Sequence, residues 1–274
     1  MSSVIDYTLI SFCYRQNGSD NMSGLVDHAT MRGMNLSLIL RTLFQHAPIS
    51  RAQLATLTGL HKASISGMVR ELVADGFVKE LPISTESSGV GRPAISLELN
   101  PQAGVILSVE IGVGYVLLIA ADFSMDVVLR DYRTNPLSDE SDKTLALVVT
   151  MLQRAYAHFD HKKQRVLGIA VGVAGLVHSD SGTLLFAPNM NWQDVAIKAI
   201  LSEHFVSPIY VLNEANLAAI GEAYRYEGTD NILLYVSSGV GVGGGIVLKG
   251  ELLEGISGHA GEIGSEQATA LAVV

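Results

Sequence analysis

The chain has 274 residues, which favours one small and one larger domain because single hydrophobic cores rarely grow beyond about 250 to 300 residues. Hydrophobic residues make up 48% of the chain and charged residues 16%, which excludes a disordered protein of low hydrophobicity. The single cysteine, Cys13, excludes an intramolecular disulfide and a multi-cysteine metal site, and it favours a reducing cytoplasm.

The formal net charge of −9 is unevenly distributed along the chain. Residues 1–100 carry eight basic and eight acidic residues, whereas the rest of the chain carries ten basic and nineteen acidic ones. The segment 32–92 alone holds seven basic against four acidic residues. A mildly basic segment therefore precedes an acidic one, and the net charge does not exclude a nucleic-acid partner.

Neither the start of the chain nor its most apolar segment predicts a membrane or export signal. Residues 1–13 lack the basic front and the small-residue cleavage site of a signal peptide. The apolar segment 105–123 contains Glu110, Gly112 and Gly114, which fit two buried strands joined by a turn better than a membrane span. We expect a cytoplasmic protein with no membrane partner, and residues 1–33 form an extension of unknown role.

Two helices are predicted at the start of the basic segment. Apolar residues recur at helical spacing over about 35–46, and Pro48 ends this first helix. Ser50, followed three residues later by Gln53, forms a capping box that opens a second, short helix, and Gly59 closes it. The residues of this helix expected to face inward are Leu54, Ala55 and Leu57.

A third helix is predicted from Lys62 to Ala74, ending where Asp75 and Gly76 supply a turn. The helix, glycine, helix spacing is that of a helix-turn-helix. The third helix is expected to bury Ile65, Met68, Val69, Leu72 and Val73. Its opposite face carries hydroxyls and cations that can reach phosphates and base edges. With two residues at the start of the second helix, the predicted DNA-binding residues are Ser50, Arg51, Lys62, Ser64, Ser66 and Arg70.

Residues 77–99 read as two strands around a small polar, glycine-rich loop, which is the pattern of a wing. Arg92, between Gly91 and Pro93, is expected to enter a minor groove of the DNA. We therefore predict a winged helix-turn-helix over 34–100 with duplex DNA as its partner. The alternative is that these elements mediate protein contacts or merely present a solvated polar face.

The remaining residues, 101–274, predict an α/β domain. Strands are expected at 105–111, 115–121, 127–132, 165–171, 209–212, 231–236 and 245–248. Helices are expected at 142–159, 192–204 and 214–225.

Two segments of this domain suit ligand chemistry. The run Ser237–Gly245 includes Gly239, Gly241 and Gly243 and follows a strand, so it fits a phosphate-binding loop or, equally, a tight hairpin. The run Asn213-Glu214-Ala215-Asn216 lies where a strand meets a helix, a place where α/β domains bind ligands. The alternative for this run is a helix cap.

The combination of motifs resembles the ROK family, which comprises bacterial sugar-responsive repressors with a winged helix and stand-alone sugar kinases. The resemblance covers about residues 34–264 and is carried by Ser50–Ala55 with Thr58–Leu60, Gly91–Pro93, Ala187–Trp192, Asn213–Asn216, Gly239–Gly245 and Gly258–Gly264. It implies an actin-like, ribonuclease-H-like fold with a sugar held between two lobes, and a homodimer in the intact family. The sugar-binding residues that it implies are Asn189, Asn213, Glu214 and Glu262.

The resemblance also bears on catalysis. Sugar kinases of the family carry Asp-x-Gly-Gly-Thr at the first phosphate turn, where this chain has Glu110 to Gly114, with Gly112 kept. Glu214 stands where those kinases have an aspartate base, and a base misplaced by about an ångström can cost about a hundredfold in rate. We expect no catalytic residue and a repressor of sugar-metabolism genes with xylose or glucose as effector. The alternatives are an ATP-dependent sugar kinase and a nonfunctional fragment.

The family normally continues after the Glu-Ile-Gly segment with a zinc-binding cysteine cluster. Here Gly264 is followed by ten residues without a cysteine. We therefore expect no zinc cofactor, no metal ligands and a C-terminally truncated sugar-kinase-type domain.

Overall fold

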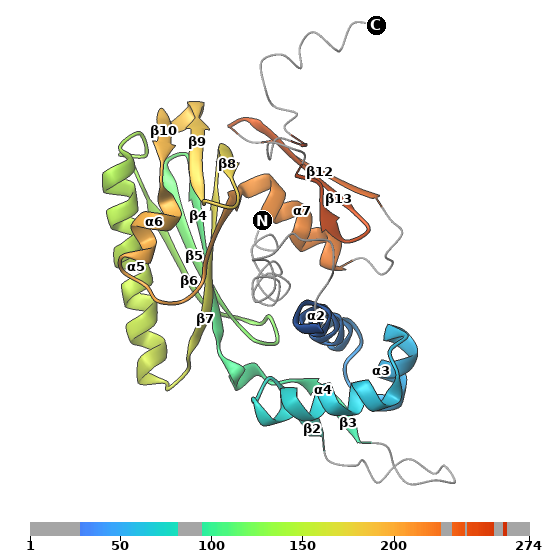
Figure 1. The fold of residues 1–274 in the computed structure, drawn as a ribbon. Coiled ribbons are helices and arrows are strands. Elements are labelled where there is room, and N and C mark those ends of the chain that lie inside the picture. The colour runs from blue at the N-terminus through green and yellow to red at the C-terminus, as the bar shows by residue number, and fades with distance from the viewer. Residues whose placement is uncertain (1–27, 82–94, 226–231, 239, 255–259, 262–274) are drawn as a thin grey trace, which may run out of the picture. The chain divides into compact units, whose positions relative to one another are not determined.

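The computed structural model describes residues 28–81, 95–225, 232–238, 240–254 and 260–261 (Figure 1). These residues fall into two compact units. One contains residues 28–105 together with 122–126, and the other contains residues 106–121 and those from 127 onward. Within the described ranges, no helix is both long enough and apolar enough to cross a membrane.

In its described residues, the first unit has three α-helices and a small antiparallel sheet (Figure 1). Its elements are α2 (His28–His46), β1 (Ile49–Ser50), α3 (Arg51–Thr58), α4 (Lys62–Ala74), β2 (Val78–Leu81) and β3 (Ser96–Leu99). The strand order is β1-β3-β2, with β3 antiparallel to both neighbours. The core of the unit is formed by fully buried side chains of all three helices: Ile39, Leu40, Leu43, Leu54, Ile65, Val69 and Leu72.

Most local predictions for this unit are confirmed. The Ser50 side chain accepts from the backbone N–H of Gln53, the Gln53 side chain accepts from the backbone N–H of Ser50, and Gly59 ends α3 with φ at 70°. Two details differ. The first helix begins at His28 rather than near residue 35, and β1 was not predicted.

The prediction that Leu57 faces inward is wrong, because its side chain is 53% exposed. The buried residues of α3 are Leu54 and Ala55, and the midpoint between them lies about 110° around the helix axis from Leu57. The wing strands pair as predicted, with Val78 opposite Leu99. The wing tip, which includes Arg92, lies outside the described residues.

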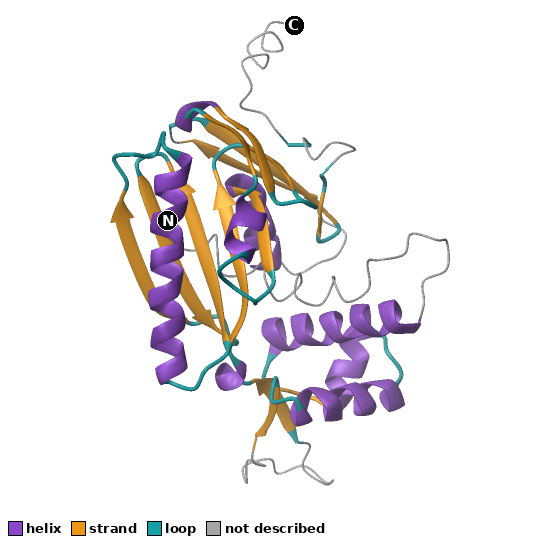
Figure 2. Cartoon of the chain, turned by 60° about the vertical axis from the view of Figure 1, so that its left-hand side comes forward, coloured by secondary structure: helices purple, strands orange, loops and turns teal. Residues whose placement is uncertain are grey.

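The second unit is built on a five-stranded sheet with the order β11-β7-β4-β5-β6. Its strands are β4 (Val105–Gly112), β5 (Tyr115–Asp122), β6 (Val127–Thr134), β7 (Val166–Val173) and β11 (Ile209–Asn213). Strand β11 is parallel to β7, and β6 is antiparallel to β5. Helix α5 (Ser141–His161) and helix α7 (Glu214–Arg225) lie on opposite faces of this sheet (Figures 1 and 2).

The described part of the second unit also contains two smaller sheets. One has the order β10-β9-β8 and the other β12-β13-β14. Their elements, with the short helices between them, are β8 (Leu176–His178), β9 (Thr183–Ala187), η2 (Pro188–Met190), β10 (Trp192–Val195), α6 (Ile197–Ser202), β12 (Ile232–Ser238), β13 (Val242–Leu248) and β14 (Glu251–Leu252). A 3₁₀ turn, η1 (Pro101–Ala103), precedes β4.

The helix predicted over 192–204 is partly wrong, because its first residues form β10 and only Ile197–Ser202 are helical. The buried indole of Trp192 donates a hydrogen bond to the carbonyl oxygen of Ser138 at 2.8 Å, and Trp192 pairs with Ala187 of β9. These long-range contacts select the strand over the helix that the local pattern also allows.

Candidate functional site

The outward face of α4 is the candidate DNA interface. Helix α4 buries Ile65, Met68, Val69 and Leu72, so the opposite face is centred on Ala63, Gly67 and Arg70. Ser64 and Ser66 lie about 160° apart around the axis, on either side of this centre. Of the predicted residues of α4, Arg70 therefore lies near the centre of the exposed face, and the two serines border it on opposite sides.

Two cations on α4 are available to a partner. Lys62 and Arg70 are both exposed, and neither forms an ion pair within the described part of the chain. Apart from its chain neighbours and the backbone of α4 itself, no described atom lies within 4 Å of the place where a Cβ on Gly67 would stand. Duplex DNA can therefore approach the middle of α4 closely, and the two cations can contact its phosphates.

Three of the predicted DNA-binding residues have structural partners. Ser50 caps α3 through Gln53, and the Ser66 hydroxyl donates to the carbonyl oxygen of Lys62 at 2.8 Å. Arg51 pairs with Glu80 of β2, at 2.5 Å between Nη2 and Oε1. In this structure the polar groups of these three side chains form contacts within the unit.

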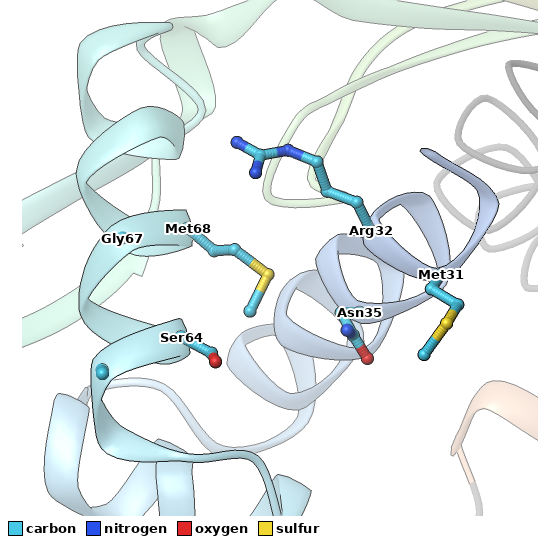
Figure 3. Close-up of a pocket in the computed structure, with 7 residues that line it drawn as sticks. Met31, Arg32, Asn35, Ser64, Gly67 and Met68 are labelled. Carbon is cyan, nitrogen blue, oxygen red and sulfur yellow. The ribbon is translucent and has the colours of Figure 1, made fainter. Parts of the chain in front are cut away.

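A groove of about 390 Å³ lies between the N-terminal half of α2 and α4. Figure 3 shows Asn35 and Ser64 on its two sides, with Met68 between the helices. Arg32 also lines the groove and pairs with Glu71 of α4. The sequence reasoning missed Arg32 and Asn35, although extending the helical pattern upstream from Leu36 would have placed them on the first helix.

The second candidate site lies in the other unit, where α7 meets the glycine-rich strand β13. Strand β13 pairs with β12 as an antiparallel hairpin, with Ser237 opposite Gly243, so the segment takes the hairpin form that the sequence left open. A Cβ on Gly243 would stand 3.0 Å from the Cβ of Ala215 and 3.6 Å from Oε1 of Glu214. The glycines allow β13 to lie directly on the first turn of α7.

The Asn213–Asn216 segment is a helix cap and also a wall of this site. Oδ1 of Asn213 accepts from the backbone N–H groups of Ala215 and Asn216, at 2.8 and 3.2 Å. Its amide nitrogen donates to the carbonyl oxygen of Gly175 at 2.9 Å. Oδ1 of the buried Asn216 has no hydrogen-bond partner within the described residues. An acceptor is therefore left at the wall formed by α7 and β13.

Asn189 approaches the same wall from η2. A Cβ on Gly241 would stand 3.4 Å from Nδ2 of the exposed Asn189. The structure thus brings Asn189 close to Gly241, just before β13, and Glu214 close to Gly243, two residues further on. Gly239 and Glu262 lie outside the described residues.

Acidic and phenolic side chains lie near Glu214. The sequence did not predict that they belong to one site. The hydroxyl of Tyr115 donates a hydrogen bond to Oε1 of Glu110. Burial raises the pKa of Tyr115, and this bond and the carboxylates of Glu110 and Glu214 raise it further. Burial also raises the pKa of Tyr235, with smaller contributions from Glu222, Glu110 and Glu214. Both phenols are therefore held in the neutral form, and Tyr115 is in direct contact with Glu110.

Comparison with known families decides the assignment of the second unit. The ROK family profile matches residues 106–272, which is more than half of the chain. The chain belongs to the ROK family. The MarR family profile matches residues 34–84, which include α3 and α4. This ROK protein thus has a MarR-type winged helix followed by a sugar-kinase-like α/β domain, and the predicted family and fold class are confirmed.

Its relatives include two curated xylose repressors. The chain is 34% identical over 239 residues to the one from Caldicellulosiruptor bescii, covering 87% of this chain and 59% of the relative. It is 32% identical over 242 residues to the one from Bacillus subtilis, covering 88% and 62%. This ROK chain therefore spans about 60% of the length of these relatives.

Among solved structures, the chain resembles a ROK family transcriptional regulator described as a homologue of the Escherichia coli MLC protein. The TM-score is 0.68 at 27% identity, and the likeness covers 86% of this chain and 60% of that chain. These relatives of the ROK chain are repressors or regulators rather than kinases.

Proposed function

We propose that this ROK protein is a transcription repressor of sugar-metabolism genes, whose winged helix binds operator DNA and whose second unit binds a sugar effector. The observation that carries the proposal is the outward face of α4. This face combines an open position at Gly67 with the exposed cations Lys62 and Arg70, which form no ion pair among the residues that the structure describes. An α-helix of this kind fits the major groove, where phosphate contacts position it and base contacts give specificity.

The groove between α2 and α4 extends the same surface. A helix in the major groove has a phosphate backbone on each side, so the flank of α4 that carries Ser64 would face one of the two strands. Asn35 and Ser64 on the walls of the groove can donate hydrogen bonds to phosphate oxygens. We therefore include Asn35 among the DNA-contacting residues.

The sugar-binding part of the proposal rests on the wall formed by α7 and β13. Asn189 and Glu214 offer the amide and carboxylate groups that pair with sugar hydroxyls, and Oδ1 of Asn216 adds a buried acceptor. We assign a pentose, xylose, as the first effector to test because the relatives from two organisms are named xylose repressors. Homodimer formation on a two-fold-symmetric operator is part of the proposal.

We further propose that the protein is a sensor and does not transfer phosphate. Glu214 is one methylene longer than an aspartate at the base position that the family resemblance implies, and misplacement of a base by about an ångström costs about a hundredfold in rate. Sugar binding does not depend on that placement. With xylose or glucose and ATP, we expect no sugar phosphate above the background of a Glu214→Gln variant.

DNA binding is tested by selecting bound duplexes from fragmented genomic DNA and measuring their affinity by fluorescence anisotropy. Lys62→Ala with Arg70→Ala should weaken binding at least about tenfold. The matched control, Arg130→Ala with Arg154→Ala, removes two exposed cations of the other unit and should leave affinity within about twofold at 0.15 M salt. Equal losses in both double variants would contradict α4 as the DNA interface.

Sugar binding is tested by calorimetry with xylose, glucose and arabinose on the folded 274-residue chain. We expect heat with at least one sugar and its loss in Glu214→Ala. Glu203→Ala is the control, because Glu203 is an exposed carboxylate that ends α6. No heat with any of the three sugars would contradict the sensor role of this chain.

A further inference from the structure

The turn between β4 and β5 is flanked by two glycines, and a side chain covers one of them. Gly112 ends β4, and Val113 and Gly114 form the turn, with φ at 83° for Gly114. Glycine turns of this kind present backbone N–H groups to phosphate when no side chain lies over them. Here a Cβ on Gly112 would stand 2.3 Å from Cε1 and Cζ of Tyr115. The phenol ring thus fills the space directly over Gly112.

Tyr115 is fixed in this position from two directions. Its hydroxyl donates to Oε1 of Glu110, on the other side of the turn. Its ring stacks on Tyr132 of β6, with 5.5 Å between ring centroids and 20° between planes. A ring held by a hydrogen bond and a stacked neighbour does not swing away without losing both contacts.

The charges beside the ring also disfavour an anion. Glu110 and Glu214 both raise the pKa of Tyr115, so both carboxylates lie close enough to interact with its phenol. A phosphoryl group in the turn would meet like charge, whereas sugar hydroxyls can donate to the same oxygens.

We infer that Tyr115 is a built-in occupant of the β4–β5 turn that excludes phosphoryl anions and leaves the neighbouring site to uncharged sugars. Tyr115 is thereby a specificity-determining residue. The inference rests on the proposed function in one respect, namely that the ligand of the second unit is a sugar. It adds a structural reason why the second unit binds the sugar but does not bind a phosphoryl donor beside it.

The test is the affinity of the 274-residue chain for inorganic triphosphate, measured by calorimetry and by ³¹P line broadening at pH 7.5. The wild type should show no binding at millimolar triphosphate. Tyr115→Ala uncovers the turn and should bind at least about tenfold more tightly, the gain expected for one or two charge-assisted hydrogen bonds. Tyr115→Val, which suits a strand, is the second variant should the alanine variant fold poorly.

Two control variants test whether the gained triphosphate binding occurs in the β4–β5 turn. Tyr115→Phe keeps the ring over Gly112 and should bind no triphosphate. Adding Gly112→Ala to Tyr115→Ala places a methyl group in the uncovered turn and should abolish the gained binding. Wild-type binding equal to that of Tyr115→Ala, no gain in either small variant, or an equal gain in Tyr115→Phe would each overturn the inference. DNA and xylose affinities measured on the same samples report separately on the proposed function.

Discussion

Gly245 of β13 lies directly against Ala219 of α7: a Cβ on Gly245 would stand 2.7 Å from the Cβ of Ala219 and 3.0 Å from the carbonyl oxygen of Ala215. Helix α7 begins with Glu214, so this packing sets how closely that carboxylate approaches β13. The glycine-rich segment therefore contributes to the site by allowing a helix and a strand to pack without intervening side chains.

Substitution of Gly245 should consequently destabilise the second unit. Gly245→Ala forces apart two backbones that cannot yield like a flexible side chain, and overpacking of this kind costs about 1 to 3 kcal/mol. Chemical denaturation followed by circular dichroism would measure the loss. Gly241→Ala is the matched control on the same segment, because the nearest described atom, Nδ2 of Asn189, is 3.4 Å away and can move. Equal losses in the two variants would contradict close packing at Gly245.

Gly67 offers a substitution that separates stability from DNA binding. Its Cβ position is open and its backbone is helical, so Gly67→Leu should stabilise α4 by about 0.5 to 1 kcal/mol. If the centre of α4 faces the bases, the same side chain should weaken DNA binding at least about tenfold because it keeps the helix out of the groove. Thermal unfolding and anisotropy on one sample test both effects. Unchanged DNA affinity would place the contact surface elsewhere.

Substitution of Ser50 should lower the stability of the fold, whereas substitution of Lys62 should change DNA binding. Ser50→Ala removes the capping box of α3 and should cost about 1 kcal/mol of stability. Lys62→Ala removes an exposed cation and should leave stability within about 0.5 kcal/mol, while the slope of log affinity against log salt falls by about 1. Denaturation and a salt series distinguish the two roles. A stability loss in Lys62→Ala as large as in Ser50→Ala would contradict this division.

The local parts of the fold could be read from the sequence. The capping box at Ser50, the bounds of α4 and the start of α7 at Glu214 all follow from spacing within one or two helical turns. Strands β8, β9 and β10 could not be predicted, because their pairing depends on residues that are distant in sequence. Trp192, for instance, is held by the carbonyl oxygen of Ser138, 54 positions away.

The same limit applies to the candidate sites. Residue type and motif indicated Lys62, Arg70 and Glu214, but not that Ser66 would bond to its own helix. Nor could the sequence show that Tyr115 lies on Gly112, because both the turn geometry and the stacking on Tyr132 are needed to fix the ring. Sequence patterns name candidate groups, whereas packing decides which of them remain available to a ligand.

The phenol of Tyr115 should titrate at unusually high pH. Burial, the hydrogen bond to Glu110 and the nearby carboxylates all favour the neutral phenol in the folded state, so its pKa lies above the ordinary value of about 10. The stabilisation linked to this shift is fully present below about pH 10 and is lost as the pH rises above it. Absorbance at 295 nm, taken as the difference between wild type and Tyr115→Phe, isolates this phenol among the nine tyrosines. A difference midpoint at or below pH 10 would show that the ring is solvated and does not cover Gly112.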